Sequence, residues 1–193
     1  IAQSSVEMTA HWDANEYTVT LDANGGEFAE DKTTVTIEVV FNAEIADLTA
    51  AEIPSKTGYT FAGFKLGEEE YFDAQGQTAK KWTQASGATM TAAWTNNTYY
   101  VVYDGNGSSS EAMAKSEHRY DVTSKLTVNT YELTGYTFQG WSLEKDGEVS
   151  LGDQAEVTTL NATANGETTI YAVWKANTYV LTLVQTDVAT LGQ

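Results

Sequence analysis

The sequence predicts a mainly β chain built as two tandem small domains. Three observations support this fold class. The phrase "MTAAWTNNTYYVVYDGNG" at 90–107 has near-copies at 8–25 and 170–183. The tryptophans of these phrases, Trp12, Trp94 and Trp174, lie 82 and 80 residues apart, which is the size of a small domain. Short runs with apolar residues at every second position dominate, and this period is typical of half-buried strands.

Each copy of the phrase predicts two strands. Apolar residues alternate with others at Tyr17, Val19 and Leu21, and the pattern recurs at 99–103 and 179–183. Just upstream, a second alternating set ends in tryptophan. Its three copies are Met8, Ala10 and Trp12, then Met90, Ala92 and Trp94, then Ile170, Ala172 and Trp174. We expect a tryptophan strand and a tyrosine strand at each copy.

The connectors between these strands, "DANE", "TNNT" and "KANT", fit either a hairpin loop or a junction between repeats. We favour the junction, in which the tryptophan strand closes one unit and the tyrosine strand opens the next. The predicted organisation has four parts. They are the end of a preceding repeat or an N-terminal strand at 1–15, repeat 1 at 16–95, repeat 2 at 96–175, and the start of a following repeat or a C-terminal tail at 176–193.

Further elements are expected inside each repeat. "GYTFAGF" at 58–64 and "GYTFQGW" at 135–141 predict strands in which Gly63 and Gly140 allow close approach of backbone or an aromatic ring. Residues 33–41 predict another strand, and residues 119–128 occupy the matching place in repeat 2. Short helical turns are expected near "IADLTAAEI", "QTAKKWTQA" and "DQAEVTTL", each shorter than a typical helix.

The order of "YTVTLDANGG", "GYTFAGF" and "TMTAAW" resembles the Listeria-Bacteroides repeat, also described as the internalin B-repeat type, which occurs in tandem on bacterial surface proteins. The resemblance covers about residues 16–95 and 98–175. It implies a β-grasp-like (α+β) fold, a twisted sheet with at most one short helix. Phe64 stands where this motif has tryptophan, and "DGNGSSS" replaces the fuller "DANGG".

Composition narrows the classes of partner. The 193 residues include 27 acidic and 10 basic side chains, a net charge of −17, which repels phosphate backbones and anionic lipid heads. We therefore expect no nucleic acid partner and no membrane insertion by this fragment, since no apolar run approaches the roughly 20 residues that span a bilayer. Cysteine is absent, and the Thr, Asn, Gly and Tyr content favours an extracellular location, at a bacterial cell surface or secreted.

No motif predicts catalysis, a cofactor or a metal. "DANGG" at 22–26 and "DGNG" at 104–107 place oxygen ligands beside glycine, but the twelfth positions of calcium-type loops would be Thr33 and Lys115 instead of an acid. We interpret both as turns in which Asn and Gly adopt positive φ. The run "GEEEYFD" at 67–73 is interpreted as an exposed acidic turn. His11 and His118 occupy non-equivalent places and lack partner motifs.

Most aromatic residues recur at strand-inward positions in both repeats and are expected in the core. Tyr71, Trp82 and Tyr100 are the least explained by repetition. They are the candidate contacts for a ligand, because exposed aromatic side chains mark binding sites.

The sequence thus predicts a non-catalytic stalk or spacer region of a cell-surface protein, monomeric and capable of weak adhesion. The alternative is an adhesin module that itself binds a host or neighbouring-cell glycan or protein through aromatic and acidic surface residues. Clustering of the three aromatic candidates on one exposed face would favour the adhesin, whereas burial or scatter would favour the spacer.

Overall fold

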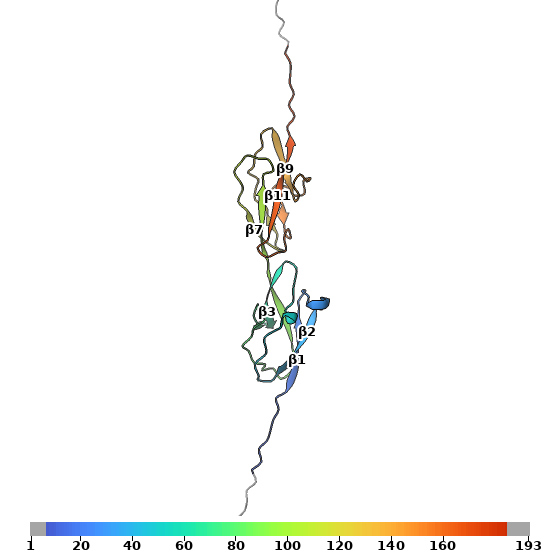
Figure 1. The fold of residues 1–193 in the computed structure, drawn as a ribbon, viewed down its shortest axis with the longest axis vertical. Helices are drawn as coiled ribbons and strands as arrows, with labels where there is room; N and C mark the ends of the chain where they lie inside the picture. Colours follow the sequence, from blue (N-terminus) through green and yellow to red (C-terminus); the bar gives the residue numbers. More distant parts are fainter. Residues whose placement is uncertain (1–6, 185–193) are drawn as a thin grey trace, which may run out of the picture. The chain divides into compact units, whose positions relative to one another are not determined.

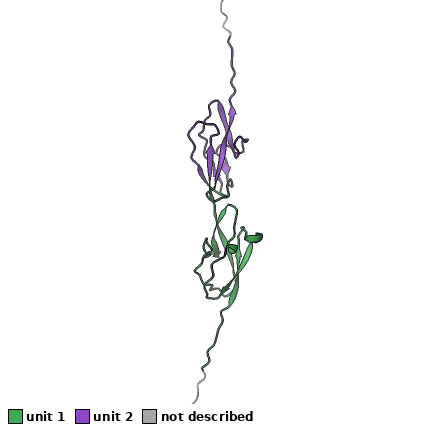
Figure 2. Ribbon diagram, viewed as in Figure 1, with its two compact units in different colours: residues 1–99, 118–122, 158–166 green, residues 100–117, 123–157, 167–193 purple. Residues whose placement is uncertain are grey.

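The computed structural model describes residues 7–184, which divide into two compact units (Figure 2). Within that range, unit 1 comprises 7–99, His118–Val122 and Thr158–Gly166, and unit 2 comprises Tyr100–Glu117, Thr123–Val157 and 167–184. Within the described range the structure is mainly β, as the sequence predicts. No helix there has the length and apolarity needed to cross a membrane.

The sheet of unit 1 has five strands in the order β2-β1-β5-β3-β4 (Figure 1). Their bounds are β1 Glu16–Asp22, β2 Thr34–Val40, β3 Tyr59–Leu66, β4 Glu69–Phe72 and β5 Thr89–Asn96. The first and last strands, β1 and β5, are parallel neighbours, and the other pairs are antiparallel. A central parallel pair formed by the first and last strands is the β-grasp-like arrangement that the family resemblance implies.

Helical structure is limited, within the described residues, to two 3₁₀ turns, η1 at Ala29–Asp31 and η2 at Ala50–Glu52. A capping box between Thr49 and Glu52 holds η2, which falls within one of the three expected helical turns. The other two stretches are not helical. Trp82, in the second of them, instead forms a β-bridge with Phe41, the residue that follows β2. Burial of its ring overrides the weak local helical preference.

Unit 2 repeats the arrangement with a four-stranded main sheet. The main sheet has the order β7-β6-β11-β9, and a two-stranded sheet pairs β10 with β8. The strands are β6 Thr98–Asp104, β7 Ser116–Arg119, β8 Ser124–Lys125, β9 Tyr136–Ser142, β10 Glu156–Val157 and β11 Glu167–Ala176. The strand expected across 119–128 is broken. β7 ends at Arg119, and Asp121 has φ 59°, a left-handed conformation that interrupts a strand.

The parallel pair at the centre of each unit differs in length. Three residue pairs join β1 to β5, from Thr20↔Thr89 to Asp22↔Thr91. Five join β6 to β11, from Tyr100↔Glu167 to Asp104↔Tyr171. Unit 2 therefore has the longer parallel contact between its first and last strands.

The cores follow the predicted alternation. In unit 1 the inward side chains of β1 and β5 include Val19, Leu21 and Met90, all fully buried. In unit 2 the corresponding strands bury Val101, Tyr103, Ile170 and Ala172 around Trp141. Burial of such apolar side chains is the main stabilising term in small domains.

The two GYTF glycines lie where the backbone of the following segment crosses their strand. Gly63 has φ 114°, and a Cβ built on it would lie 2.1 Å from the Phe72 carbonyl oxygen. Gly140 has φ 145°, and its Cβ would lie 2.6 Å from the Leu151 carbonyl oxygen. Register shifts accompany both positions, so the glycines permit bulges with close backbone contact, as expected.

Each outer copy of the phrase forms only one of its two expected strands, β1 in the copy at 8–25 and β11 in the copy at 170–183. Residues 7–15 and 177–184 lack strand structure, with Met8, Trp12, Tyr179 and Leu183 between 79 and 90 % exposed. A tryptophan strand in this fold lies between the first strand and the GYTF strand of its own unit. Within the described residues, β1 and β3 already pair with β5, so the tryptophan segment at 8–12 has no such partners. The tyrosine segment at 179–183 would need a tryptophan strand beside it, and the described ones, β5 and β11, pair with the strands of their own units.

Candidate functional site

The three aromatic candidates occupy different environments. Tyr71 and Trp82 lie in the core of unit 1, 4 and 0 % exposed, with ring centroids 5.8 Å apart. Tyr100 belongs to unit 2 and is half-buried, with the Lys115 ammonium 4.2 Å from its ring centroid. Tyr71 and Trp82 therefore offer no ring face to solvent in this structure. Ligand contact stays a prediction, and Tyr100 is the candidate with an accessible side chain.

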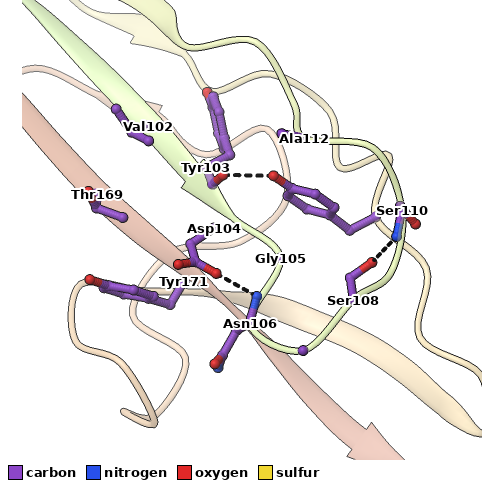
Figure 3. Close-up of a pocket in the computed structure, with 12 residues that line it drawn as sticks. Val102, Tyr103, Asp104, Gly105, Asn106, Ser108, Ser110, Ala112, Thr169 and Tyr171 are labelled. Carbon is purple, nitrogen blue, oxygen red and sulfur yellow. Dashed lines mark hydrogen bonds between the residues drawn. The ribbon is translucent and has the colours of Figure 1, made fainter.

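A cavity of about 530 Å³ opens in unit 2 at the end of β6 (Figure 3). Its lining combines the outer face of β6 and β11 with the loop that follows β6. Representative lining residues are Val102, Asp104, Asn106, Ser110, Tyr131 and Tyr171. Aromatic and carboxylate side chains therefore meet here in one concave surface, which is typical of small-ligand sites.

The floor of the cavity is an Asx turn. Asp104 Oδ1 accepts a hydrogen bond from the backbone N–H of Asn106 at 2.7 Å, and Asn106 has φ 43°. The Asn106 side-chain amide donates to the Ala172 carbonyl at 3.0 Å. The Trp174 indole N–H donates to the Gly105 carbonyl at 2.9 Å. These bonds tie the turn to β11 and fix the direction of Asp104.

Unit 1 contains the same hydrogen-bonded frame. Asp22 Oδ1 accepts from the Asn24 N–H, the Asn24 side chain donates to the Ala92 carbonyl, and the Trp94 indole donates to the Ala23 carbonyl. The repeated "DANG" and "DGNG" letters thus encode a turn bonded to the last strand of each unit. This agrees with the interpretation of both sequences as turns.

Tyr131 anchors the far wall of the cavity. Its hydroxyl donates to the Tyr103 carbonyl at 2.7 Å and accepts from the Met113 N–H at 3.1 Å. Ser108 Oγ donates to the Glu132 carbonyl at 2.7 Å. Figure 3 shows the Ser108 side chain along one side of the cavity and Tyr171 with Asp104 along the other. The loop after β6 is therefore held by several bonds.

The pKa values of Lys115 and His118, two groups near the sheet of unit 2, are shifted. Lys115 Nζ lies 2.6 Å from Glu167 Oε1, and this hydrogen bond raises the pKa of the Lys115 ammonium. His118 is 3 % exposed and stacks on Tyr99 with centroids 5.5 Å apart; burial lowers the pKa of its imidazole. His11 is exposed. Across residues 7–184, no group of three or more His, Cys, Asp or Glu is placed to hold a metal ion.

Sequence reasoning did not single out Tyr171 or the cavity. The signal lies in the differences between the two repeats. Counted from the tryptophan of each unit, Tyr171 stands three residues before Trp174, where unit 1 has Thr91 three residues before Trp94. A bulky aromatic residue on the outer face of a strand that carries threonine in its sister copy marks a surface specific to one repeat.

Comparison with known proteins identifies the repeats. The model of the Listeria-Bacteroides repeat domain matches residues 17–69 and 99–173. A protein of Evansella cellulosilytica named "Putative membrane protein" is 33 % identical over 176 residues, which is 88 % of this chain and 24 % of that protein. Another from the same organism, "Putative Gly-rich membrane protein", is 28 % identical over 174 residues, 90 % of this chain and 18 % of that protein.

The chain thus spans about a quarter or less of the length of these curated relatives. No solved structure gives a significant match. The family model covers β3 and β9 and most of β1, β6 and β11, whereas β5 lies outside the matched ranges. The matched motifs include those that form the Asx turns and the glycine bulges. This chain belongs to the Listeria-Bacteroides repeat family.

Proposed function

We propose that the chain is a non-catalytic repeat region of the internalin B-repeat type that acts as a stalk or spacer in a bacterial cell-surface protein. Membership of a tandem repeat family supports this function. The names of the two relatives, both membrane proteins, support a location in the cell envelope, with the repeats outside the cell. The large negative charge favours a well-solvated monomer.

The parallel pairing of first and last strands is the observation that carries the proposal. A force on a unit enters at the N-terminal end of β1 and leaves at the C-terminal end of β5. Because these strands are parallel neighbours, the force slides them past each other along their length. All backbone hydrogen bonds between them are then loaded together, instead of breaking one after another as at the end of a hairpin.

Unit 2 has the same geometry. β6 and β11 are parallel neighbours over five residue pairs, so force on unit 2 also acts as shear. The trailing end of β5 and the leading end of β6 are separated by Asn97 alone. Asn97 is 8 % exposed, accepts from Thr60 Oγ1 and donates to the Ala162 carbonyl. Both partners belong to unit 1, so Asn97 is held within that unit.

Single-molecule pulling on the whole chain between terminal handles tests the proposal. We expect two unfolding events at forces well above those of domains that bear no load. The event from unit 1 should occur at the lower force, because β1 and β5 share three residue pairs whereas β6 and β11 share five. Unfolding at the forces of ordinary unselected domains would remove the mechanical role.

The absence of cysteine allows a matched control. Thr20 and Thr89 are register partners across β1 and β5, so Thr20→Cys with Thr89→Cys places a disulfide across the pair. Oxidation should shorten the extension released by unit 1 by the 69-residue spacing of these positions, about 24 nm at ~3.5 Å per residue. The reduced double variant should release the full length. With the disulfide formed, force bypasses the hydrogen bonds between β1 and β5, so a unit 1 event that kept its force after oxidation would mean that this pair is not the one that resists the load.

Extracellular exposure and monomeric state have their own tests. Intact cells of the source bacterium should bind an antibody raised against this chain, and protease added to intact cells should remove the epitope. Labelling only after cell lysis would contradict the surface location. Sedimentation velocity of the purified chain should give a single species of 21.0 kDa, and a dimer would contradict the monomer.

A further inference from the structure

The outer faces of the central strands differ between the units in a systematic way. Residues 16–40 of unit 1 correspond to 98–122 at a spacing of 82, which pairs Asp22 with Asp104 and Asn24 with Asn106. On the outer face, unit 1 carries Thr18, Thr20 and Thr91, whereas unit 2 carries Tyr100, Val102 and Tyr171. The hydrogen-bonded turn is retained, and the surface beside it has changed from threonine to aromatic and aliphatic residues.

The cavity has a second cause in the loop after the first strand. Phe28 of unit 1 is 5 % exposed and stacks on Phe64 with centroids 6.4 Å apart. At the same spacing of 82, unit 2 has Ser110. Its hydroxyl is bonded to the backbone of Glu132, and the residue lines the cavity. Ser110 thus places a small side chain on the cavity wall, where a phenylalanine would take up space.

The polar groups that face this space are hydrogen-bond acceptors or hydroxyls. Asp104 Oδ1 and the Asn106 amide nitrogen are committed to the turn. Among the described residues, none donates to Asp104 Oδ2 or to Asn106 Oδ1, and the Tyr171 hydroxyl makes no bond with that part of the chain. Asp104 and Tyr171 are register neighbours on adjacent parallel strands, so an aromatic ring and a carboxylate lie side by side.

The charge of the lining excludes anionic ligands. Asp104 contributes a negative charge, and no Lys or Arg of the described residues lines the cavity. Lys115, on the same loop, is paired with Glu167 and lies over Tyr100. A ligand that donates several hydrogen bonds, carries no negative charge and has an apolar ring face satisfies the lining.

We propose that this cavity binds a neutral saccharide, with the C–H face of one sugar ring on Tyr171 and sugar hydroxyls donating to Asp104 and Asn106. The bonds of the Asx turn and of Tyr131 hold the acceptors in place before the ligand arrives, which lowers the entropy cost of binding. The site belongs to unit 2 alone. It does not depend on the spacer role, since a unit can bear load with or without a bound glycan.

The test uses the whole chain, labelled with ¹⁵N, and a panel of neutral oligosaccharides comprising chitohexaose, cellohexaose, maltoheptaose and mannohexaose. We expect saturable chemical-shift changes for at least one of them at the amides of Asp104, Asn106 and Tyr171. The dissociation constant should be about 0.1–10 mM, as expected of a small open site. Absence of binding by the whole panel at about 20 mM, above the weakest expected dissociation constant, would overturn the proposal.

Two variants restore the features of unit 1. Tyr171→Thr removes the ring and should weaken binding about tenfold, whereas Tyr171→Phe should retain most of it. Ser110→Phe should fill the cavity and abolish binding. Thr91→Tyr, the reciprocal change in unit 1, leaves the site of unit 2 intact and should not weaken binding. Dispersed unit 2 peaks show that each unit 2 variant is folded, and unchanged unit 1 peaks show that the change is confined to unit 2.

Ligands of other classes complete the test. Choline and a lysine-rich peptide probe the carboxylate as a cation site, and 3′-sialyllactose probes an anionic sugar. Binding of choline or the peptide at Asp104 without any neutral saccharide, or binding that Tyr171→Thr leaves unchanged, would overturn the saccharide assignment. Loss of saccharide binding together with unchanged unfolding forces would leave the spacer proposal standing.

Discussion

The two units share a hydrogen-bonded frame and differ in what fills it. In both, the tryptophan of the last strand donates its indole N–H to the turn after the first strand, at 3.0 Å in unit 1 and 2.9 Å in unit 2. Around that frame, unit 1 packs Phe28 and Phe64, whereas unit 2 packs Tyr131 and Trp141. Backbone bonding fixes a few positions, and the remaining core tolerates exchange of residues of similar total volume.

The strongest effect should come from the largest ring in the core of unit 2. Trp141 is fully buried and contacts Tyr103 and Phe138 at centroid distances of 5.2 and 5.0 Å. Trp141→Ala should lower the free energy of unfolding of unit 2 by about 3–5 kcal/mol. Hydrogen exchange should show lost protection at Val101 of unit 2 and unchanged protection at Val19 of unit 1.

Leu143 provides the control for this substitution, because it follows β9 and is 47 % exposed. Leu143→Ala should change stability by less than about 0.5 kcal/mol. Equal loss of protection in both units after Trp141→Ala would show that the units unfold as one, which would end the comparison between independent cores.

Substitution of the bulge glycines, Gly63 in unit 1 and Gly140 in unit 2, should give the next largest loss of stability. The two losses compare how strongly each unit requires glycine at its bulge. Gly63→Ala and Gly140→Ala should each cost roughly 1–3 kcal/mol, from strained backbone and contact with a carbonyl oxygen. The loss should be greater for Gly63, since its Cβ would approach the oxygen to 2.1 Å against 2.6 Å for Gly140. Thermal unfolding of the two variants measures the order.

Gly67 separates the two causes of this loss. It has φ 62° but no heavy atom within 4 Å of an added Cβ. Gly67→Ala therefore reports backbone strain alone and should cost about 1 kcal/mol. If Gly67→Ala were as damaging as Gly63→Ala, close contact with the Phe72 carbonyl could not be the reason that unit 1 requires glycine in β3.

His118 should produce the smallest effect, and it depends on pH. Burial lowers the pKa of its imidazole below the ordinary value of 6.5 in the folded protein. Below pH 6.5 the unfolded chain binds the proton more readily than the folded chain does. The free energy of unfolding should therefore fall as the pH decreases through 6.5, by at most about 1.4 kcal/mol per pH unit, until the pH passes the folded-state pKa.

Urea unfolding on either side of the ordinary histidine value of 6.5, at about pH 7.5 and about pH 5.5, measures the dependence. His118→Gln should reduce the difference between the two pH values, whereas His11→Gln, at an exposed position, should not. The same pH dependence in the wild type and in His118→Gln would assign it to carboxylates instead of the buried imidazole.

Much of the fold follows from local patterns. Period-two alternation predicted the central strands, since one face of each lies on a core, as at Val19 and Leu21. The glycines of the GYTF motif and the Asx turns were also predictable, because positive φ and close backbone approach restrict the residue type at those positions.

The remaining features depend on contacts between distant segments. Trp82 lies in a stretch without strand period, and its burial results from the irregular chain between β4 and β5 closing over the sheet beside Tyr71. The break after Arg119 needs one left-handed residue, Asp121, which no local signal marked. The cavity emerges only when Ser110 is compared with Phe28 in three dimensions.

The indole bond from Trp94 to the Ala23 carbonyl has a consequence for the order in which the chain acquires structure. Its two ends are 71 residues apart, and β5 fills the centre of the sheet between β1 and β3. Until residues 89–96 leave the ribosome or the secretion channel, Val19 and Leu21 face water and the sheet is in two pieces. Each repeat therefore completes its fold only when its last strand emerges, and a chain delivered from its N-terminus matures one repeat at a time.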